Sequence, residues 1–343
     1  MQLLSYEDVL DRIEGSKPSL LLGNGFSRAI RGEFAYDSLF ELAKESGLPA
    51  SAVALFERFG TTNFEAVMRL LEDSNWIALH YNLLPHGDRN PITDDLTHIK
   101  QSLISAISHT HPPHTFSLTL QEKQSCRYFL SPFHDIFSLN YDLLLYWVSN
   151  DGTSLKLDGF GFPGNDSANP PYLVLTQLRD RRGWLFNLHG ALHLYTADGE
   201  TRKHRFHYER RPLIEIICEG IQKSEYPLFV AEGSAKQKLR HIGSNAYLSF
   251  CFQEFKKCQG KLVCYGLSFG ESDGHIMHAI AENKGLSNLL VGLFGDPEEP
   301  HNLATRAAVT QLKKTRSRRV PNLPDLAVEY FDSGSANVWT RDL

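Results

Sequence analysis

The sequence lacks several features that mark whole classes of protein. It has no Cys-x-x-Cys pair, and its five cysteines are odd in number and widely spaced, which argues against a zinc ribbon and against a disulfide framework. No apolar run approaches the roughly 20 residues that span a bilayer, and no basic segment followed by an apolar stretch opens the chain. We therefore expect no membrane span and no signal peptide, and the scattered thiols favour a reducing, cytoplasmic location.

The chain also carries no excess of positive charge. Lysine and arginine total 35 against 40 aspartates and glutamates, a formal net charge of −5. This balance argues against broad nucleic-acid binding, because such binding depends on neutralising phosphates. The only dense basic run, residues 313–319, falls near the end of an expected helix, where cations complement the helix dipole. We interpret it as a solvated helix end and expect no nucleic-acid partner.

What the sequence does contain is an alternation of strand-like and helical segments, with 42% hydrophobic and 22% charged residues, as in globular proteins. Such alternation predicts an α/β fold: a Rossmann-like parallel sheet covered by helices on both faces. We expect an opening helix capped by Ser5 with Asp8, and an edge strand at residues 326–331. The other strand-like runs are residues 19–22, 135–139, 173–176, 184–188, 262–266 and 288–294.

Residues 36–126 differ from the rest of the chain. They contain helical patterns and no convincing strand, so we predict a large helical insertion or lid after the first β-α unit. Residues 158–171, rich in Gly, Pro, Asn and Asp, are expected to form a loop. Because no internal repeat or interdomain linker is evident, we expect residues 1–343 to form a single domain.

Polar or glycine-rich segments follow three of the expected strands. The first is the turn Gly23-Asn24-Gly25-Phe26-Ser27, placed where bare backbone amides and a positive helix end can hold a diphosphate. Glycine would let the phosphate reach the backbone, but Arg28 stands where the dinucleotide fingerprint has its third glycine. A plain strand-to-helix turn is the alternative.

The second and third segments contain Asn140, Asp142 and His189. In a parallel sheet the carboxyl ends of the strands meet at one edge, so all three segments are expected at one crevice. Either Asn140 or Asp142 could instead cap the following helix, and His189 could be a structural residue. His189 and His193 have the spacing of helical zinc ligands, but Gly190 replaces the glutamate of that motif and disfavours a helix.

We expect that neither of two further histidine groups binds a ligand. Residues 109–114 contain two prolines and are expected to form a solvated loop. His275 and His278 have helical spacing, but with no Cys or acid to complete a set we interpret them as structural, and we expect no metal.

A fourth loop, after the strand at 262–266, contains Gly266, Ser268 and Asp273. Gly266 and Ser268 would let backbone and hydroxyl approach a ribose or phosphate, while Asp273 is expected to cap the next helix. No role is derived for Glu232, Ser234 and Lys238, which follow an apolar run.

These strand-end motifs together resemble the sirtuin-like clan of NAD-binding proteins, and most closely a bacterial family of uncharacterised function within it. The closer likeness includes residues 158–161, 191–195 and 227–234. The resemblance implies that the turn from Gly23 to Ser27 holds the NAD diphosphate. It also implies that Asn140 and Asp142 lie beside the nicotinamide ribose, that His189 is the general base, and that the adenosine half contacts Gly266, Ser268 and Asp273.

By this resemblance the expected activity is NAD hydrolysis to nicotinamide and ADP-ribose, with NAD as substrate, in antiphage defence. True sirtuin deacylases carry a zinc ribbon that this chain lacks, so water is the expected acceptor. Neutral His189, with an ordinary pKa of about 6.5, would accept the proton. The alternatives are ADP-ribosyl transfer to a macromolecule and a non-catalytic nucleotide sensor; a homo-oligomer or an activating protein is an expected partner.

Overall fold

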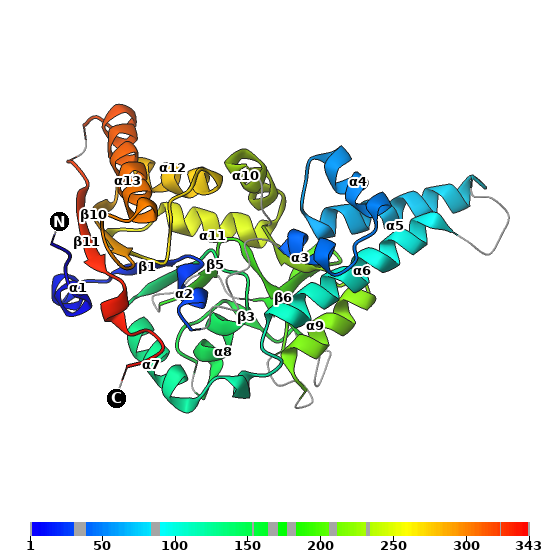
Figure 1. Ribbon diagram of the computed structural model, residues 1–343, viewed down its shortest axis with the longest axis horizontal. Coiled ribbons are helices and arrows are strands. Elements are labelled where there is room, and N and C mark those ends of the chain that lie inside the picture. The colour runs from blue at the N-terminus through cyan, green and yellow to red at the C-terminus, as the bar shows by residue number, and fades with distance from the viewer. Residues whose placement is uncertain are drawn as a thin grey trace.

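The computed structural model describes residues 2–30, 39–83, 90–152, 154–163, 171–176, 183–205, 211–230, 234–322 and 324–341. Within these residues the chain forms a six-stranded parallel sheet, a five-stranded antiparallel sheet and helices that pack around both (Figure 1). The α/β prediction is therefore confirmed. No helix of the described part is both long and apolar enough to cross a membrane.

The parallel sheet has the strand order β11-β10-β9-β1-β2-β5. Counted along the chain within this sheet, the order is 3-2-1-4-5-6, that of a Rossmann fold, whose topological switch point lies between its first and fourth strands. Here these are β1 and β9, which pair in parallel with Leu21 opposite Cys264. The bounds are β1 (Ser19–Leu22), β2 (Asp135–Ser138), β5 (Leu185–Asn187), β9 (Gly260–Tyr265), β10 (Leu286–Leu293) and β11 (Ala327–Asp332).

Both faces of this sheet are buried, as its continuous apolar strands require. Leu20 and Leu22 of β1 belong to one hydrophobic cluster and Leu21 to the other, because successive side chains of a strand point to opposite faces. The first cluster includes residues of α1 (Tyr6–Ile13), α7 (Leu120–Leu130) and α8 (Leu144–Asn150). The second includes residues of α11 (Ala246–Lys256), α12 (Gly274–Glu282) and α13 (Pro300–Arg319).

The antiparallel sheet was not predicted. Its order is β3-β4-β7-β6-β8, with bounds β3 (Phe160–Gly161), β4 (Tyr172–Leu175), β6 (Gly190–Ala197), β7 (Glu200–His204) and β8 (Pro227–Phe229). The run expected at residues 173–176 as a strand of the parallel sheet forms β4 here, and β3 lies in the segment expected to be a loop. The dipeptide Asp198-Gly199, with φ +53° and +77°, closes the β6–β7 hairpin and was a sequence signal for it.

The predicted helical insertion is present as α3 (Leu39–Glu45), α4 (Ala50–Phe59), α5 (Phe64–His80) and α6 (Pro91–Thr110). The described residues between 39 and 130 contain no strand. In Figure 1 these helices lie on the side of the molecule opposite to the β10–β11 edge of the parallel sheet. Helix α7 starts inside the predicted interval but packs on the parallel sheet, since its Phe129 ring lies 5.1 Å from the Tyr265 ring of β9.

Three predicted details have clear outcomes. Ser5 and Asp8 form a reciprocal capping box at the start of α1, and β11 is the edge strand of its sheet. The basic run is only partly the solvated helix end that was predicted: Arg316 is buried, and its guanidinium donates to the carbonyls of Asn283 (2.5 Å) and Leu286 (3.0 Å).

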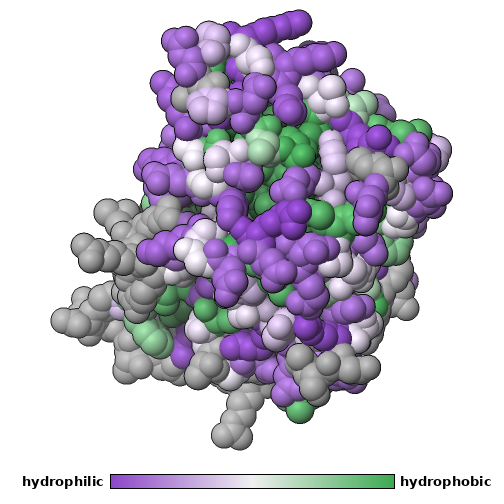
Figure 2. All heavy atoms as spheres, turned by 90° about the vertical axis from the view of Figure 1, so that its left-hand side faces the viewer, coloured by the Kyte–Doolittle hydropathy of each residue, from purple (hydrophilic) through white to green (hydrophobic). Residues whose placement is uncertain are grey.

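The side of the molecule that carries α13 and β11 has a largely hydrophilic surface, which an apolar patch interrupts (Figure 2).

Candidate functional site

Two loops touch at the topological switch point of the parallel sheet. The amide of Gly23 donates to the Tyr265 carbonyl and the amide of Gly25 to the Gly266 carbonyl, both at 2.9 Å. A Cβ atom on Gly25 would lie 2.5 Å from the Gly266 Cα, and Gly266 itself has φ +71°. These glycines are therefore required for the close approach of the two loops, a role that the sequence motif alone did not reveal.

The Asn140 and Asp142 side chains join the first of these loops. Ser27 Oγ donates to Asp142 Oδ2 at 2.5 Å, and Asn140 Nδ2 donates to the Gly23 carbonyl at 3.0 Å and to Ser27 Oγ at 3.2 Å. All three side chains are buried. Two motifs more than 110 residues apart thus form one hydrogen-bond network, as the strand-end argument predicted.

Asp142 also contributes to the start of α8. Its Oδ1 accepts the Leu144 amide at 2.9 Å, but the N-cap residue of α8 is Leu143, so neither Asn140 nor Asp142 occupies the cap position that the alternative required. Burial raises the pKa of this carboxyl, while the hydrogen bonds from Ser27 and the Leu144 amide oppose the rise. The two hydrogen bonds favour the charged form of the carboxyl, and its burial opposes that form.

His111 supports the same turn and was not identified from the sequence. Its Nε2 accepts the Leu143 amide at 2.9 Å, its Nδ1 lies 3.0 Å from the Pro112 carbonyl, and its ring packs edge-on against Trp147. Burial lowers its pKa to about 4. The expected loop is present at residues 111–114, but α6 continues to Thr110 and the expectation of a solvated segment was wrong for His111, whose ring is buried.

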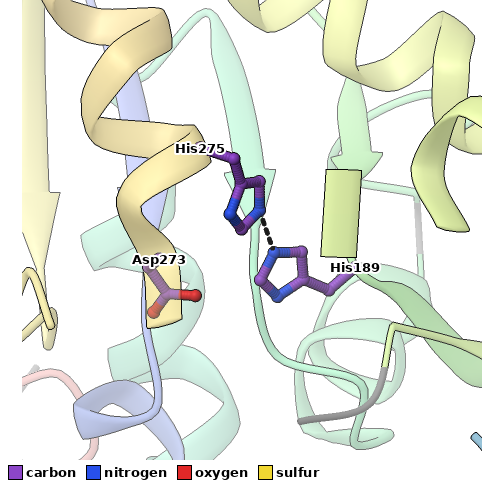
Figure 3. A group of neighbouring side chains, drawn as sticks. All are labelled: His189, Asp273 and His275. Atoms are coloured by element: carbon purple, nitrogen blue, oxygen red, sulfur yellow. Dashed lines mark hydrogen bonds between the residues drawn. The ribbon is translucent and has the colours of Figure 1, made fainter. Parts of the chain in front are cut away.

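His189 lies in the turn between β5 and β6, and β5 is adjacent to β2 in the sheet. Its Nε2 is 2.9 Å from the Nε2 of His275, and both rings are buried (Figure 3). Burial lowers the pKa of His189, and the neighbouring His275 ring lowers it further. Burial also lowers the pKa of His275, to about 4. Both rings are therefore neutral near pH 7, and one Nε2–H donates to the other Nε2.

The segment after His189 is a strand, as the rejection of a helical zinc motif predicted. Gly190 begins β6 with φ +72°, and a Cβ atom there would lie 2.0 Å from the Leu228 carbonyl oxygen. His193 points elsewhere and stacks on Tyr146, with ring centroids 4.0 Å apart. His189 and His193 therefore do not form a metal-binding pair.

Asp273 and His275 approach His189 from the start of α12 (Figure 3). One donor atom of each of the three residues lies within 4.8 Å of the others. The interpretation of His275 as a histidine without a nearby acid was wrong, because it overlooked both Asp273 and His189. Asp273 occupies the cap position of α12 without a capping hydrogen bond; its Oδ1 instead accepts from Lys238 Nζ at 2.8 Å.

The remaining predicted residues have different environments. Phe26 is a core residue whose ring packs on Trp339, whereas Asn24 and Ser268 are exposed. The amides of Phe26 and Ser27 donate to the carbonyls of Gly23 and Asn24, so these groups already have partners. Ser234 caps α10 (Ala235–Ser244), and Glu232 lies outside the described residues.

Comparison with protein families gives one result. Residues 20–339 match the model of a family described as a domain of unknown function, DUF4917. The match spans nearly the whole chain, so the chain belongs to this family. Comparison with proteins of curated function finds no match.

Proposed function

We propose that this member of the DUF4917 family is an NAD glycohydrolase, which cleaves the bond between nicotinamide and ribose and transfers the ADP-ribosyl group to water. One observation carries the proposal. Ser27, Asn140 and Asp142 form a buried hydrogen-bond network after β1 and β2, at the switch point of a sheet with the Rossmann strand order. His189 follows β5, the strand adjacent to β2. Sheets of this topology bind dinucleotides in the crevice at that point.

The residue types suit this reaction. Departure of nicotinamide leaves positive charge on the ribose, and the carboxylate of Asp142 would stabilise that charge in a site with little water. The Asn140 amide would hold a ribose hydroxyl or the attacking water in position. Water supplies the new bond to the anomeric carbon, and its proton would pass to the neutral ring of His189.

The contacts of His189 set a condition on this role. Its Nε2 is engaged by His275 at 2.9 Å. Proton transfer to Nε2 therefore requires the contact between the two histidines to open. Because Asn140, Asp142 and His189 all have partners within the chain, a non-catalytic sensor of NAD or ADP-ribose is the second candidate.

Chromatography of nicotinamide and ADP-ribose after incubation with NAD tests the proposal. We expect product from the wild type and loss of product in Asn140→Ala and His189→Ala, while His301→Ala, at an exposed histidine, retains activity. Binding of NAD without turnover would favour the sensor, and adenine label on a macromolecule would favour a transferase. Undiminished turnover in His189→Ala would remove the proposed base.

A further inference from the structure

We propose that His189, Asp273 and His275 bind one divalent transition-metal ion of the Zn²⁺ type. The three side chains come from two segments far apart in the sequence, the β5–β6 turn and the start of α12, and one donor atom of each lies within 4.8 Å of the others (Figure 3). This site is additional to the proposed cleavage of NAD. Its existence does not depend on that activity.

The donor set and its spacing support the proposal. Two imidazole nitrogens and a carboxylate oxygen are the protein ligands of one common class of zinc site, which leaves the fourth position open. The three donor atoms lie within 4.8 Å of one another, and the two Nε2 atoms are 2.9 Å apart. A small adjustment of these side chains would place each donor at the roughly 2.0–2.2 Å that Zn²⁺ requires.

The contact between the two rings sets a condition on metal binding. Without a metal, one Nε2 carries the proton that it donates to the other Nε2. A metal-binding histidine carries its proton on the other ring nitrogen, so this proton must move to Nδ1 when the metal binds. Nδ1 of His275 is buried without a hydrogen-bond partner and can take this proton, which leaves both Nε2 lone pairs for the metal.

Lys238 opposes the metal. Its ammonium group lies 2.8 Å from Asp273 Oδ1, with the lysine side chain 10% and the aspartate side chain 28% exposed. A cation must therefore compete with this ammonium for the carboxylate, and the partial exposure of Asp273 provides the route of entry. Removing the ammonium group should strengthen metal binding, whereas removing any of the three ligands should weaken it.

Metal binding has a consequence that rests on the proposed function. The metal and the proton would use the same Nε2 lone pair of His189, so Zn²⁺ would inhibit NAD cleavage. The direct test of the site uses no NAD. Metal binding without any NAD turnover would therefore support the metal site and count against the hydrolase. NAD turnover without metal binding would support the hydrolase and count against the metal site.

Calorimetric titration of the chelator-treated full chain with ZnCl₂ tests the proposal, and the visible spectrum with Co²⁺ reports the geometry. We expect one saturable site in the wild type, an affinity lower by roughly tenfold or more in His275→Ala and Asp273→Asn, and a higher affinity in Lys238→Met. His301→Ala is the matched surface control. If His275→Ala does not fold, the metal affinities of His275→Gln and Asp273→Asn test the site in its place. No saturable binding in the wild type, or unchanged affinity in the ligand variants, would overturn the proposal.

Discussion

Ser27 and Asp142 follow neighbouring strands and share a buried hydrogen bond of 2.5 Å. Both groups have little access to water, so each depends on the other for a hydrogen-bond partner. This pair joins the turn after β1 to the start of α8.

Replacing Ser27 by Ala should therefore affect both stability and activity. The Asp142 carboxylate would lose one of its donors, and we expect the free energy of unfolding to fall by about 1–3 kcal/mol. Urea unfolding measures this loss, and NAD turnover should fall with it. Ser317→Ala, at an exposed serine of α13, is the control and should stay within about 0.5 kcal/mol of the wild type. Equal stabilities of the two variants would contradict the role of Ser27.

His111 predicts a pH dependence of stability. Its pKa is about 4 in the folded protein and about 6.5 in an unfolded chain. Between these pH values the unfolded state binds more protons than the folded state. The contribution of His111 to stability is therefore fully present above pH 6.5 and falls as the pH is lowered towards 4. The contribution of this histidine is at most about 3.4 kcal/mol. Urea unfolding across this range should show a shallower decline for His111→Gln, and parallel declines would contradict this account.

Gly190 should not tolerate a side chain. Its φ is +72°, and a Cβ atom would lie 2.0 Å from the Leu228 carbonyl oxygen, so Gly190→Ala would separate β6 from β8. We expect a loss of at least about 3 kcal/mol in the free energy of unfolding, since both strain and a backbone clash contribute. Gly243 is exposed in α10, and a Cβ atom added there would have no other atom within 4 Å, which makes it the matched control. Gly243→Ala should stabilise by about 0.5–1 kcal/mol.

Two arginines of the same basic run should behave differently. Arg316 is buried and donates to carbonyls at the end of α12 and the start of β10, whereas Arg318 is exposed. Arg316→Gln should lower the free energy of unfolding by about 2 kcal/mol or more, because charge-assisted hydrogen bonds are lost in the core. Arg318→Gln should change it by less than about 0.5 kcal/mol. Thermal and urea unfolding of the two variants would separate these roles.

The missed elements share a physical cause. The strands β6 and β7 were not predicted because β6 is buried along most of its length, so it shows no alternation of apolar and polar residues, although the Asp198-Gly199 turn marked the hairpin. The buried position of His111 depends on a contact with Leu143 across 32 residues. No local pattern contains such information.

The sequence by itself determined the α/β class, the buried strands of the parallel sheet and the helical insertion, because apolar runs and helical periodicity report burial and local backbone preference. It also determined that the Gly23, Asn140 and His189 segments follow strands. Only the tertiary structure decided which side chains meet: Ser27 with Asp142, and His189 with His275 rather than with His193. These contacts depend on strand order and on how α12 packs against the sheet, and both arise from long-range packing that no local sequence pattern encodes.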